Sequence, residues 1–182
     1  MRKMLNCFEN NTPDVFSREL RLGYNVNGQG KDYKTLLIKI IEAKGFPEGY
    51  KLDYVAQILY NYQPKNSDYY IDLNIRDYKG RSAIYSAIEN GYTTIVDTLI
   101  FYAKNHPESP LDIHNTSPSG YHHTYTALEY AKKINKAKPS KESQIIVNKL
   151  EEYNNFRQPI CQSEPKKTSG SDMKPDLILG FR

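Results

Sequence analysis

The segment 77–100 most constrains what this chain can fold into, because it reads as a tight turn followed by two short helices. Gly91 stops the first predicted helix, since glycine readily adopts the left-handed conformation that ends helices. Each predicted helix has one apolar face, made of Ala83, Ile84, Ala87 and Ile88 in the first and Ile95, Val96, Leu99 and Ile100 in the second. A unit this small cannot bury its own apolar surface, so it must pack against neighbouring units of the same kind.

Two further segments follow the same pattern, and each begins at a hydroxyl residue. Thr35, Ser82 and Thr126 mark the three starts, at spacings of 47 and 44 residues. The matching apolar positions are Leu36, Leu37, Ile40, Ile41, Val55, Ala56 and Leu59 upstream, and Ala127, Leu128, Ala131, Ile146, Val147 and Leu150 downstream. The sequence therefore predicts three consecutive turn-helix-helix units.

This pattern resembles the ankyrin repeat, whose first helix carries a T-P-L-H-x-A signature over about 33 residues. Residues 24–27 and 71–74 also resemble the family's A-D-V-N junction. The proline of the signature is absent in all three units, and the spacing requires insertions. The resemblance implies an all-α fold, a solenoid of stacked helix-turn-helix units with turn or β-hairpin tips. HEAT and armadillo repeats, with periods of about 40–47 residues, are the alternative.

The expected organisation is an N-terminal capping half-repeat at 1–29, an ankyrin-repeat domain at 30–156 and a flexible C-terminal tail at 157–182. Thr12, Pro13 and Gly23 predict one helix in the cap. The repeats are expected at about 30–76, 77–111 and 120–153, with insertions at 46–53 and 104–121. Lys132 and Glu151 replace Ile88 and Ile100 in the last unit, as is typical of a repeat with nothing stacked beyond it.

Charge and composition narrow the function classes. The net charge is +4, and it is not clustered as in nucleic-acid-binding proteins. No run approaches the ~18 apolar residues of a membrane span, and no apolar stretch after the first residues indicates a signal peptide. Cys7 and Cys161 do not suggest a disulfide framework. These features predict a cytoplasmic monomer.

No motif carries clear catalytic or metal-binding chemistry. Residues 23–28 have the glycine spacing of a phosphate loop, but Gln29 stands where the motif requires lysine. The histidines do not have zinc-ligand spacing, and Cys7 is interpreted as a small buried residue. We therefore expect no enzyme, no cofactor and no metal. An enzyme whose site is built by the insertions, from His122, His123 or Cys7, is the alternative.

The resemblance implies a protein that binds a partner protein through the turn tips and the exposed side of each first helix. Carried over to this sequence, the contact positions are Lys31, Asp32, Lys34 and Glu42, then Tyr78, Lys79, Arg81 and Glu89, and last His122, His123, Tyr125 and Lys133. Replacing Tyr78 and Arg81 together is expected to weaken binding without affecting folding.

Two narrower versions of this hypothesis remain open. The Lys, Asn, Ile and Tyr bias is typical of AT-rich genomes, and small ankyrin proteins of such bacteria resemble effectors delivered into the host cytosol without a signal peptide. In that version the segment 163–182 serves as the export signal. A dedicated inhibitor or subunit of one partner is the other version, and it predicts a more apolar contact face.

Overall fold

The computed structural model describes residues 1–62, 70–114 and 125–157, and in these residues it contains eight α-helices and no β-strand. The helices are α1 (Arg2–Glu9), α2 (Pro13–Arg21), α3 (Leu36–Glu42), α4 (Glu48–Asn61), α5 (Ala83–Asn90), α6 (Thr93–Asn105), α7 (Ala127–Ala137) and α8 (Lys141–Arg157). The predicted all-α class is confirmed. The described tips are closed by turns, so the β-hairpins expected there are absent from this part of the chain.

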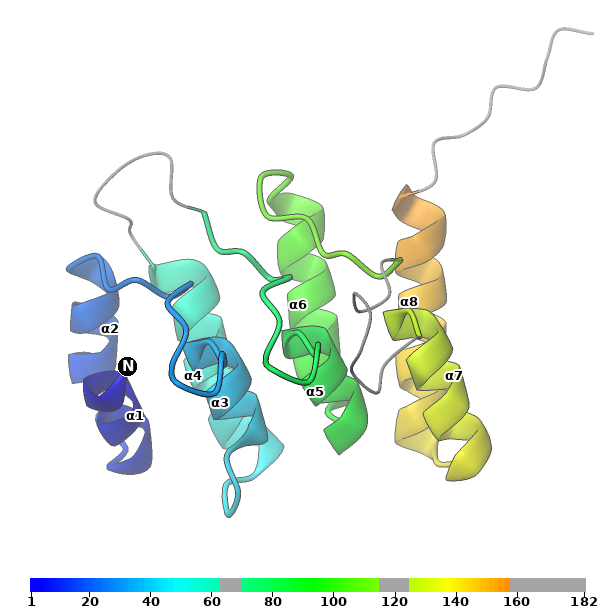
Figure 1. Cartoon of the computed structure of the whole chain (residues 1–182), viewed down its shortest axis with the longest axis horizontal. Coiled ribbons are helices and arrows are strands. Elements are labelled where there is room, and N and C mark those ends of the chain that lie inside the picture. The colour runs from blue at the N-terminus through cyan, green and yellow to red at the C-terminus, as the bar shows by residue number, and fades with distance from the viewer. Residues whose placement is uncertain (63–69, 115–124, 158–182) are drawn as a thin grey trace, which may run out of the picture.

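The helices form four pairs that lie in a row (Figure 1). In each pair, two helices that are consecutive in sequence pack against each other. The first helices α1, α3, α5 and α7 are neighbours along one side of the row, and α2, α4, α6 and α8 are neighbours along the other. We call the turns that precede α3 and α5, at residues 30–34 and 77–81, the tips.

The predicted helix starts are correct. Thr35 and Thr126 are the N-caps of α3 and α7, and Thr126 forms a reciprocal capping box with Glu129. Ser82 precedes α5 with an extended backbone. Gly91 ends α5 in the left-handed conformation, with φ of 70°, which explains why glycine is required there.

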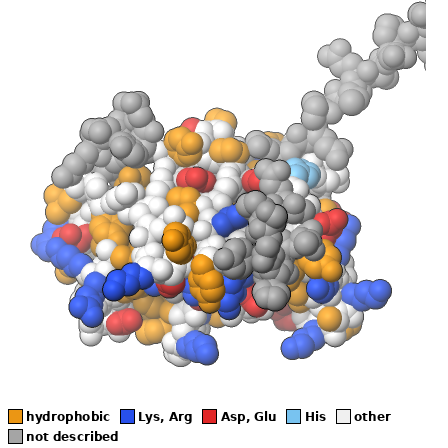
Figure 2. All heavy atoms as spheres, viewed as in Figure 1, with side chains coloured by type: hydrophobic (Ala, Val, Ile, Leu, Met, Phe, Trp, Pro, Cys, Tyr) orange, Lys and Arg blue, Asp and Glu red, His pale blue; other side chains and the backbone are white. Residues whose placement is uncertain are grey.

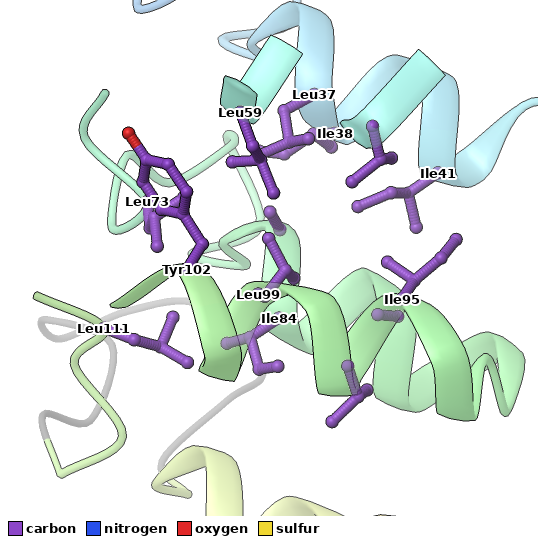
Figure 3. Packing of buried hydrophobic residues seen from close by; sticks show 14 of the residues in the cluster. Leu37, Ile38, Ile41, Leu59, Leu73, Ile84, Ile95, Leu99, Tyr102 and Leu111 are labelled. Carbon is purple, nitrogen blue, oxygen red and sulfur yellow. The ribbon is translucent and has the colours of Figure 1, made fainter. Parts of the chain in front are cut away.

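The core is continuous within the pairs and across the interfaces between them. Figure 3 shows side chains of α3 and α4 facing those of α5 and α6 across the interface between their pairs. Ile40, Ile84, Leu99 and Leu150, from different helices, are all fully buried. Each pair thus covers apolar surface of the next, as the small size of the units requires.

The first turn of α4 connects three neighbouring helices through buried or partly buried polar contacts. Lys51 is only 2% exposed, and its Nζ donates to the carbonyl of Ile41 at 3.0 Å and to Tyr92 Oη at 2.6 Å. The Glu48 carboxylate accepts hydrogen bonds from the backbone N–H groups of Thr94 and Ile95. The Lys51 ammonium thus lies at the C-terminal end of α3, and the Glu48 carboxylate lies at the N-terminal end of α6. Helix dipoles favour both placements.

Asparagine side chains align the loops of successive pairs. Asn27 Nδ2 donates to the carbonyl of Tyr70 at 2.7 Å, and its Oδ1 accepts from the N–H of Asp72 at 3.0 Å. Asn74 makes the same two contacts with Pro110 and Asp112. We call these two residues the asparagine splints, because each spans from one pair to backbone atoms of the next.

The α7–α8 pair differs from the others in a way that suits the end of the row. His114, which follows Asp112 and Ile113, stands where the earlier loops have a splint asparagine. Lys132 and Glu151 form an ion pair at 2.8 Å with both side chains about half exposed. The corresponding Ile88 and Ile100 are buried, so the prediction that this face is solvated is confirmed among the described residues.

Two expectations about the helices were wrong. The helix predicted from Thr12 and Pro13 is present as α2, but the expectation of one helix in this segment missed α1, whose short apolar face of Met4, Cys7 and Phe8 is buried. Residues 46–53 are not an insertion between helices, since Glu48 already begins α4 and Pro47 is compatible with a helix start. The connection between α3 and α4, residues 43–47, is only three residues longer than the one between α5 and α6, residues 91–92.

Other expectations fall on residues that are not described. The tail is described only to residue 157, and the proposed extension at 104–121 only to residue 114. In the described residues, no helix is both long enough and apolar enough to cross a membrane.

Candidate functional site

The tips before α3 and α5 have the same backbone hydrogen bonds. Gly30 N–H donates to the carbonyl of Lys34 at 3.1 Å, and Asp77 N–H donates to that of Arg81 at 2.9 Å. Inside each tip, the residue before the cation has a positive φ: 57° at Tyr33 and 75° at Gly80. Lys34 and Arg81 are therefore equivalent, and so are Tyr33 and Gly80.

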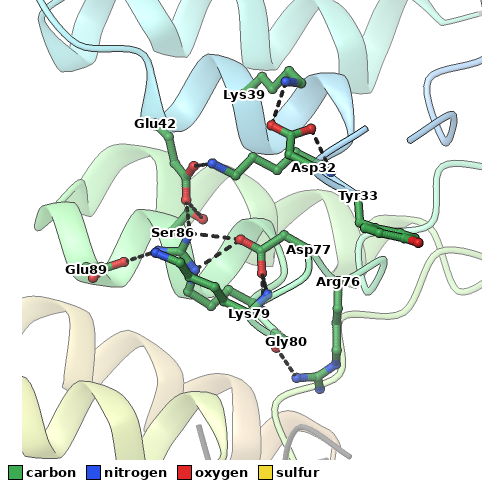
Figure 4. Close-up of polar contacts among 12 residues, drawn as sticks. Asp32, Tyr33, Lys39, Glu42, Arg76, Asp77, Lys79, Gly80, Ser86 and Glu89 are labelled. Carbon is green, nitrogen blue, oxygen red and sulfur yellow. Dashed lines mark hydrogen bonds and ion pairs between the residues drawn. The ribbon is translucent and has the colours of Figure 1, made fainter. Parts of the chain in front are cut away.

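These equivalent cations begin a line of ion pairs that crosses from one helix pair to the next (Figure 4). Lys34 pairs with Glu42 at 2.6 Å, Glu42 pairs with Arg81 at 2.8 Å, and Arg81 pairs with Glu89 at 2.7 Å. We call Lys34, Glu42, Arg81 and Glu89 the charge ladder. All four are predicted contact residues, and the structure brings them together along α3 and α5.

Arg81 is a structural centre rather than an exposed contact, which corrects the expectation for this residue. It is 7% exposed, and it bonds the fully buried carboxylate of Asp77 through both Nε and Nη2. Burial by itself lowers the pKa of Arg81, but the hydrogen bond to Asp77 and the charges of Glu42, Asp77 and Glu89 raise it overall. The guanidinium is charged at any pH at which the protein folds.

A second ion pair lies beside the ladder, between Asp32 and Lys39 at 2.8 Å. Partial burial acts to raise the pKa of Asp32, but the hydrogen bond from Lys39 and the positive charge of its ammonium outweigh burial and lower that pKa. The pKa of Lys34 is raised by Glu42 against the effect of burial in the same way. Both residues therefore stay ionised, and the surface keeps its charge pattern near neutral pH.

The residue before the N-cap of α7 continues the spacing with different chemistry. Lys34 and Glu42 are eight residues apart, as are Arg81 and Glu89. In the third unit the same spacing joins Tyr125 and Lys133, whose Nζ lies 4.3 Å from the centre of the Tyr125 ring. A cation–π contact thus takes the place of the ion pair.

Two hollows lie along the side formed by α1, α3 and α5. One of about 520 Å³ is lined by the charge ladder and by Asp32, Lys39, Ala43, Lys44, Lys79 and Asn90. The other, of about 750 Å³, is lined by Met1, Arg2, Leu5, Asn6, Glu9, Gly30, Lys31, Asp32 and Lys39. The Asp32–Lys39 pair lines both, so the hollows form one continuous surface that we call the groove.

The remaining predicted residues have mixed positions. Lys31, Tyr78, Lys79 and Lys133 are exposed, and Tyr125 is half-buried. His122 and His123 lie outside the described residues. The predicted contact set therefore divides into an exposed group, a partly buried ion-pair ladder and two residues of which the structure gives no account.

The sequence analysis missed Tyr33, Lys39 and Lys44. A signal for Tyr33 was available, because the triplet Asp-Tyr-Lys occurs both at 32–34 and at 77–79. The triplets repeat after 45 residues, whereas the hydrogen-bonded tips repeat after 47. Aligning the residue types therefore matches Tyr33 with Tyr78, but the backbone hydrogen bonds match Tyr33 with Gly80.

The alternative catalytic residues gain no support from the described part of the chain. Cys7 is buried in α1 and makes no side-chain hydrogen bond with His106 or His114, the two described histidines. Within the described ranges, no three histidine, cysteine or acidic side chains lie close enough together to hold a metal ion.

A third hollow, of about 450 Å³, lies on the other side of the row, between α2 and α4. Its lining includes Tyr50, Tyr54 and Tyr60 and the single carboxylate of Asp53. It offers aromatic surface but no pair of groups suited to acid–base chemistry.

No family model, curated protein or solved structure matches this chain. Its fold and site define an all-helical protein of four packed helix pairs with a charged groove along its first helices.

Proposed function

We propose that this chain is a non-enzymatic, ankyrin-like repeat protein that binds a partner protein through the groove and the adjoining tips. Contacts that recur at a constant offset of 47 residues support the repeat interpretation. They include the splints Asn27 and Asn74 and the cation–carboxylate pairs Lys34–Glu42 and Arg81–Glu89. The turn tips favour an ankyrin-like stack over plain helical hairpins of the HEAT type.

The observation that carries the binding proposal is the groove itself. It runs along the first helices of three successive pairs and is lined mainly by charged side chains, and Tyr78, 47% exposed, lies on the tip before α5. Exposed tyrosine beside a polar rim is typical of protein interfaces, because the ring supplies a large contact area at low entropic cost. The polar lining does not favour the dedicated-inhibitor version, which predicts an apolar face.

Site-specific photo-crosslinking tests this proposal. A benzophenone amino acid replaces Tyr78 in one sample and Phe101 in the other, and both are exposed aromatic residues on different sides of the row. We expect Tyr78 to crosslink one protein from cells of the source organism or its host, and Phe101 not to crosslink it. Labelling of the same protein only from Phe101 would place the binding surface on the second helices.

The effector version is a separate proposal, because it depends on the tail. A reporter fused to residues 157–182 and expressed in a bacterium with a host-directed secretion system measures delivery into host cytosol. Delivery above that of a reporter carrying the reversed tail sequence supports the version. Equal delivery of both reporters removes it and leaves the binding proposal intact.

A further inference from the structure

We infer that Tyr33 and three lysines that line the groove, Lys31, Lys44 and Lys79, bind an acidic segment of the partner protein. This inference rests on the proposed function and adds the chemistry of the partner. Three observations support it: the charge balance of the groove, the absence of carboxylate partners for these lysines, and the backbone conformation of Tyr33.

The groove is positively charged beyond its internal pairs. Seven basic and four acidic side chains line the two hollows, which leaves a net charge of +3, whereas the whole chain carries +4. The rest of the chain together carries only +1, so this surface is distinctly more positive than the remainder of the protein. Figure 2 shows part of this surface as blue side chains gathered at the lower left, over α1 and α3.

The lysines that carry this excess are available to a ligand. Lys34, Lys39 and Arg81 are neutralised by carboxylates of the groove. In contrast, no carboxylate among the described residues lies within ion-pair distance of the Nζ of Lys31, Lys44 or Lys79, and all three side chains are exposed. Partner carboxylates therefore complete the charge pattern at these positions without breaking an existing pair.

Tyr33 is held in a conformation that does not suit it. Its φ of 57° is in the left-handed region, which is unfavourable for a bulky side chain and which the equivalent tip gives to Gly80. The ring gains little from this in the free protein, because it is 60% exposed and points away from the Asp32–Lys39 pair (Figure 4). Gln29 Nε2 donates to the carbonyl of Tyr33 and to that of Arg76, and so holds the tip in place.

Strain of this kind, where the surrounding structure maintains it, is concentrated at functional sites. Tyr33 exposes its ring on the same tip as Lys31, at the edge of the groove, and this suits a polypeptide whose carboxylates reach the lysines while an apolar side chain packs on the ring. A nucleic acid is disfavoured, because Asp32, Glu42 and Glu89 in the same groove would repel its continuous phosphate backbone.

The test uses peptides as probes. A phage-displayed library of random dodecapeptides is selected on the full chain, and the Kd of selected peptides is measured by fluorescence anisotropy. We expect the selected peptides to carry net negative charge and to compete with the protein that crosslinks at Tyr78. Neutral or basic peptides that compete, or equal competition by a single-stranded DNA of similar length, would overturn the inference.

Two variants identify the contact residues. Tyr33→Asn accepts the left-handed conformation, so we expect Tm to be unchanged or higher and the peptide Kd to rise at least about tenfold. Lys44→Glu with Lys79→Glu is expected to weaken binding by a similar factor, and Lys136→Glu with Lys138→Glu, on the exposed surface of α7 and just after it, is the control of equal charge change.

The outcomes separate the two proposals. Unchanged Kd in both groove variants, with crosslinking at Tyr78 retained, refutes this inference and leaves the proposed function standing. A lower Tm for Tyr33→Asn shows instead that the ring stabilises the tip, and it also overturns the argument from strain. Absence of any crosslink at Tyr78 refutes the proposed function.

Discussion

Lys34 and Arg81 occupy equivalent places in two tips, but their surroundings give them different roles. Lys34 has one carboxylate partner and is partly exposed, whereas Arg81 binds three carboxylates and is almost entirely buried. Asp77 depends on Arg81 for neutralisation, because its own side chain is fully buried. At the residue scale, the charge ladder therefore combines a buried structural residue, Arg81, with residues that are partly exposed to solvent, such as Lys34.

Removing Arg81 should destabilise the fold strongly. Arg81→Ala leaves the buried Asp77 carboxylate without its cation, and breaking such a buried pair costs about 3–5 kcal/mol. Urea denaturation measures the loss. Lys34→Ala is the matched control at the equivalent position, where a partly exposed pair contributes about 1 kcal/mol or less. Similar losses for both variants would show that Arg81 is not the centre of the network.

The Asp32–Lys39 pair should make stability depend on pH in the acid range. The pKa of Asp32 is lowered on folding, so its contribution is present above the unfolded pKa of about 3.9 and is lost as pH falls below that value. Asp32→Asn should cost about 0.2–1 kcal/mol at pH 7. The difference from wild type should vanish near pH 2, as measured by thermal unfolding across the pH range.

At the scale of the elements, helix starts were predictable because they depend on neighbouring residues. Thr35 and Thr126 cap their helices with side-chain hydrogen bonds to nearby N–H groups, Ser82 is the N-cap residue of α5 by its extended backbone, and Gly91 ends α5 by its own backbone conformation. Lys51 could not be predicted as buried, because its partners Ile41 and Tyr92 are 10 and 41 residues away. The burial of Arg81 likewise depends on Glu42 of the preceding pair.

The contact of Glu48 with α6 is a cap supplied by another helix. Glu48→Ala should cost about 1 kcal/mol, since it removes an acceptor from two N–H groups at a helix N-terminus. Asp53→Ala, an exposed carboxylate on the same helix, is the control and should have little effect. Equal free energies of unfolding for the two variants, measured by urea denaturation, would contradict the capping role.

The central core of α6 should be highly sensitive to truncation. Leu99 is fully buried between the second and fourth pairs, and Leu99→Ala should cost about 2–5 kcal/mol through lost burial and a residual cavity. Phe101, two residues further along and 59% exposed, provides the control, and Phe101→Ala should change stability by about 0.5 kcal/mol or less. The same denaturation assay compares them.

At the scale of the whole molecule, stability depends on contacts between successive pairs. Each pair packs mainly on its neighbours in the row, so folding should be cooperative only while those interfaces are intact. Sequence periodicity predicted this arrangement of units. It did not predict the groove, because the groove is formed by side chains from α1, α3 and α5 that are distant in sequence.

The asparagine splints provide a test of this coupling. Asn74→Ala leaves the Pro110 carbonyl and the Asp112 N–H without their partner, and we expect a loss of about 1–2 kcal/mol. His114→Ala changes the corresponding position of the next loop, whose side chain is exposed, and should be nearly neutral. Native-state hydrogen exchange should show faster exchange at Asp112 only in the Asn74 variant.

The splints also have a consequence for how this surface can diversify. Asn27 and Asn74 bind backbone carbonyl groups, which every residue type has, and backbone N–H groups, which every residue type except proline has. Alignment of the loops is therefore insensitive to the identity of the displayed side chains. New recognition properties can arise at exposed tip positions by substitution alone, without any compensating change in the scaffold.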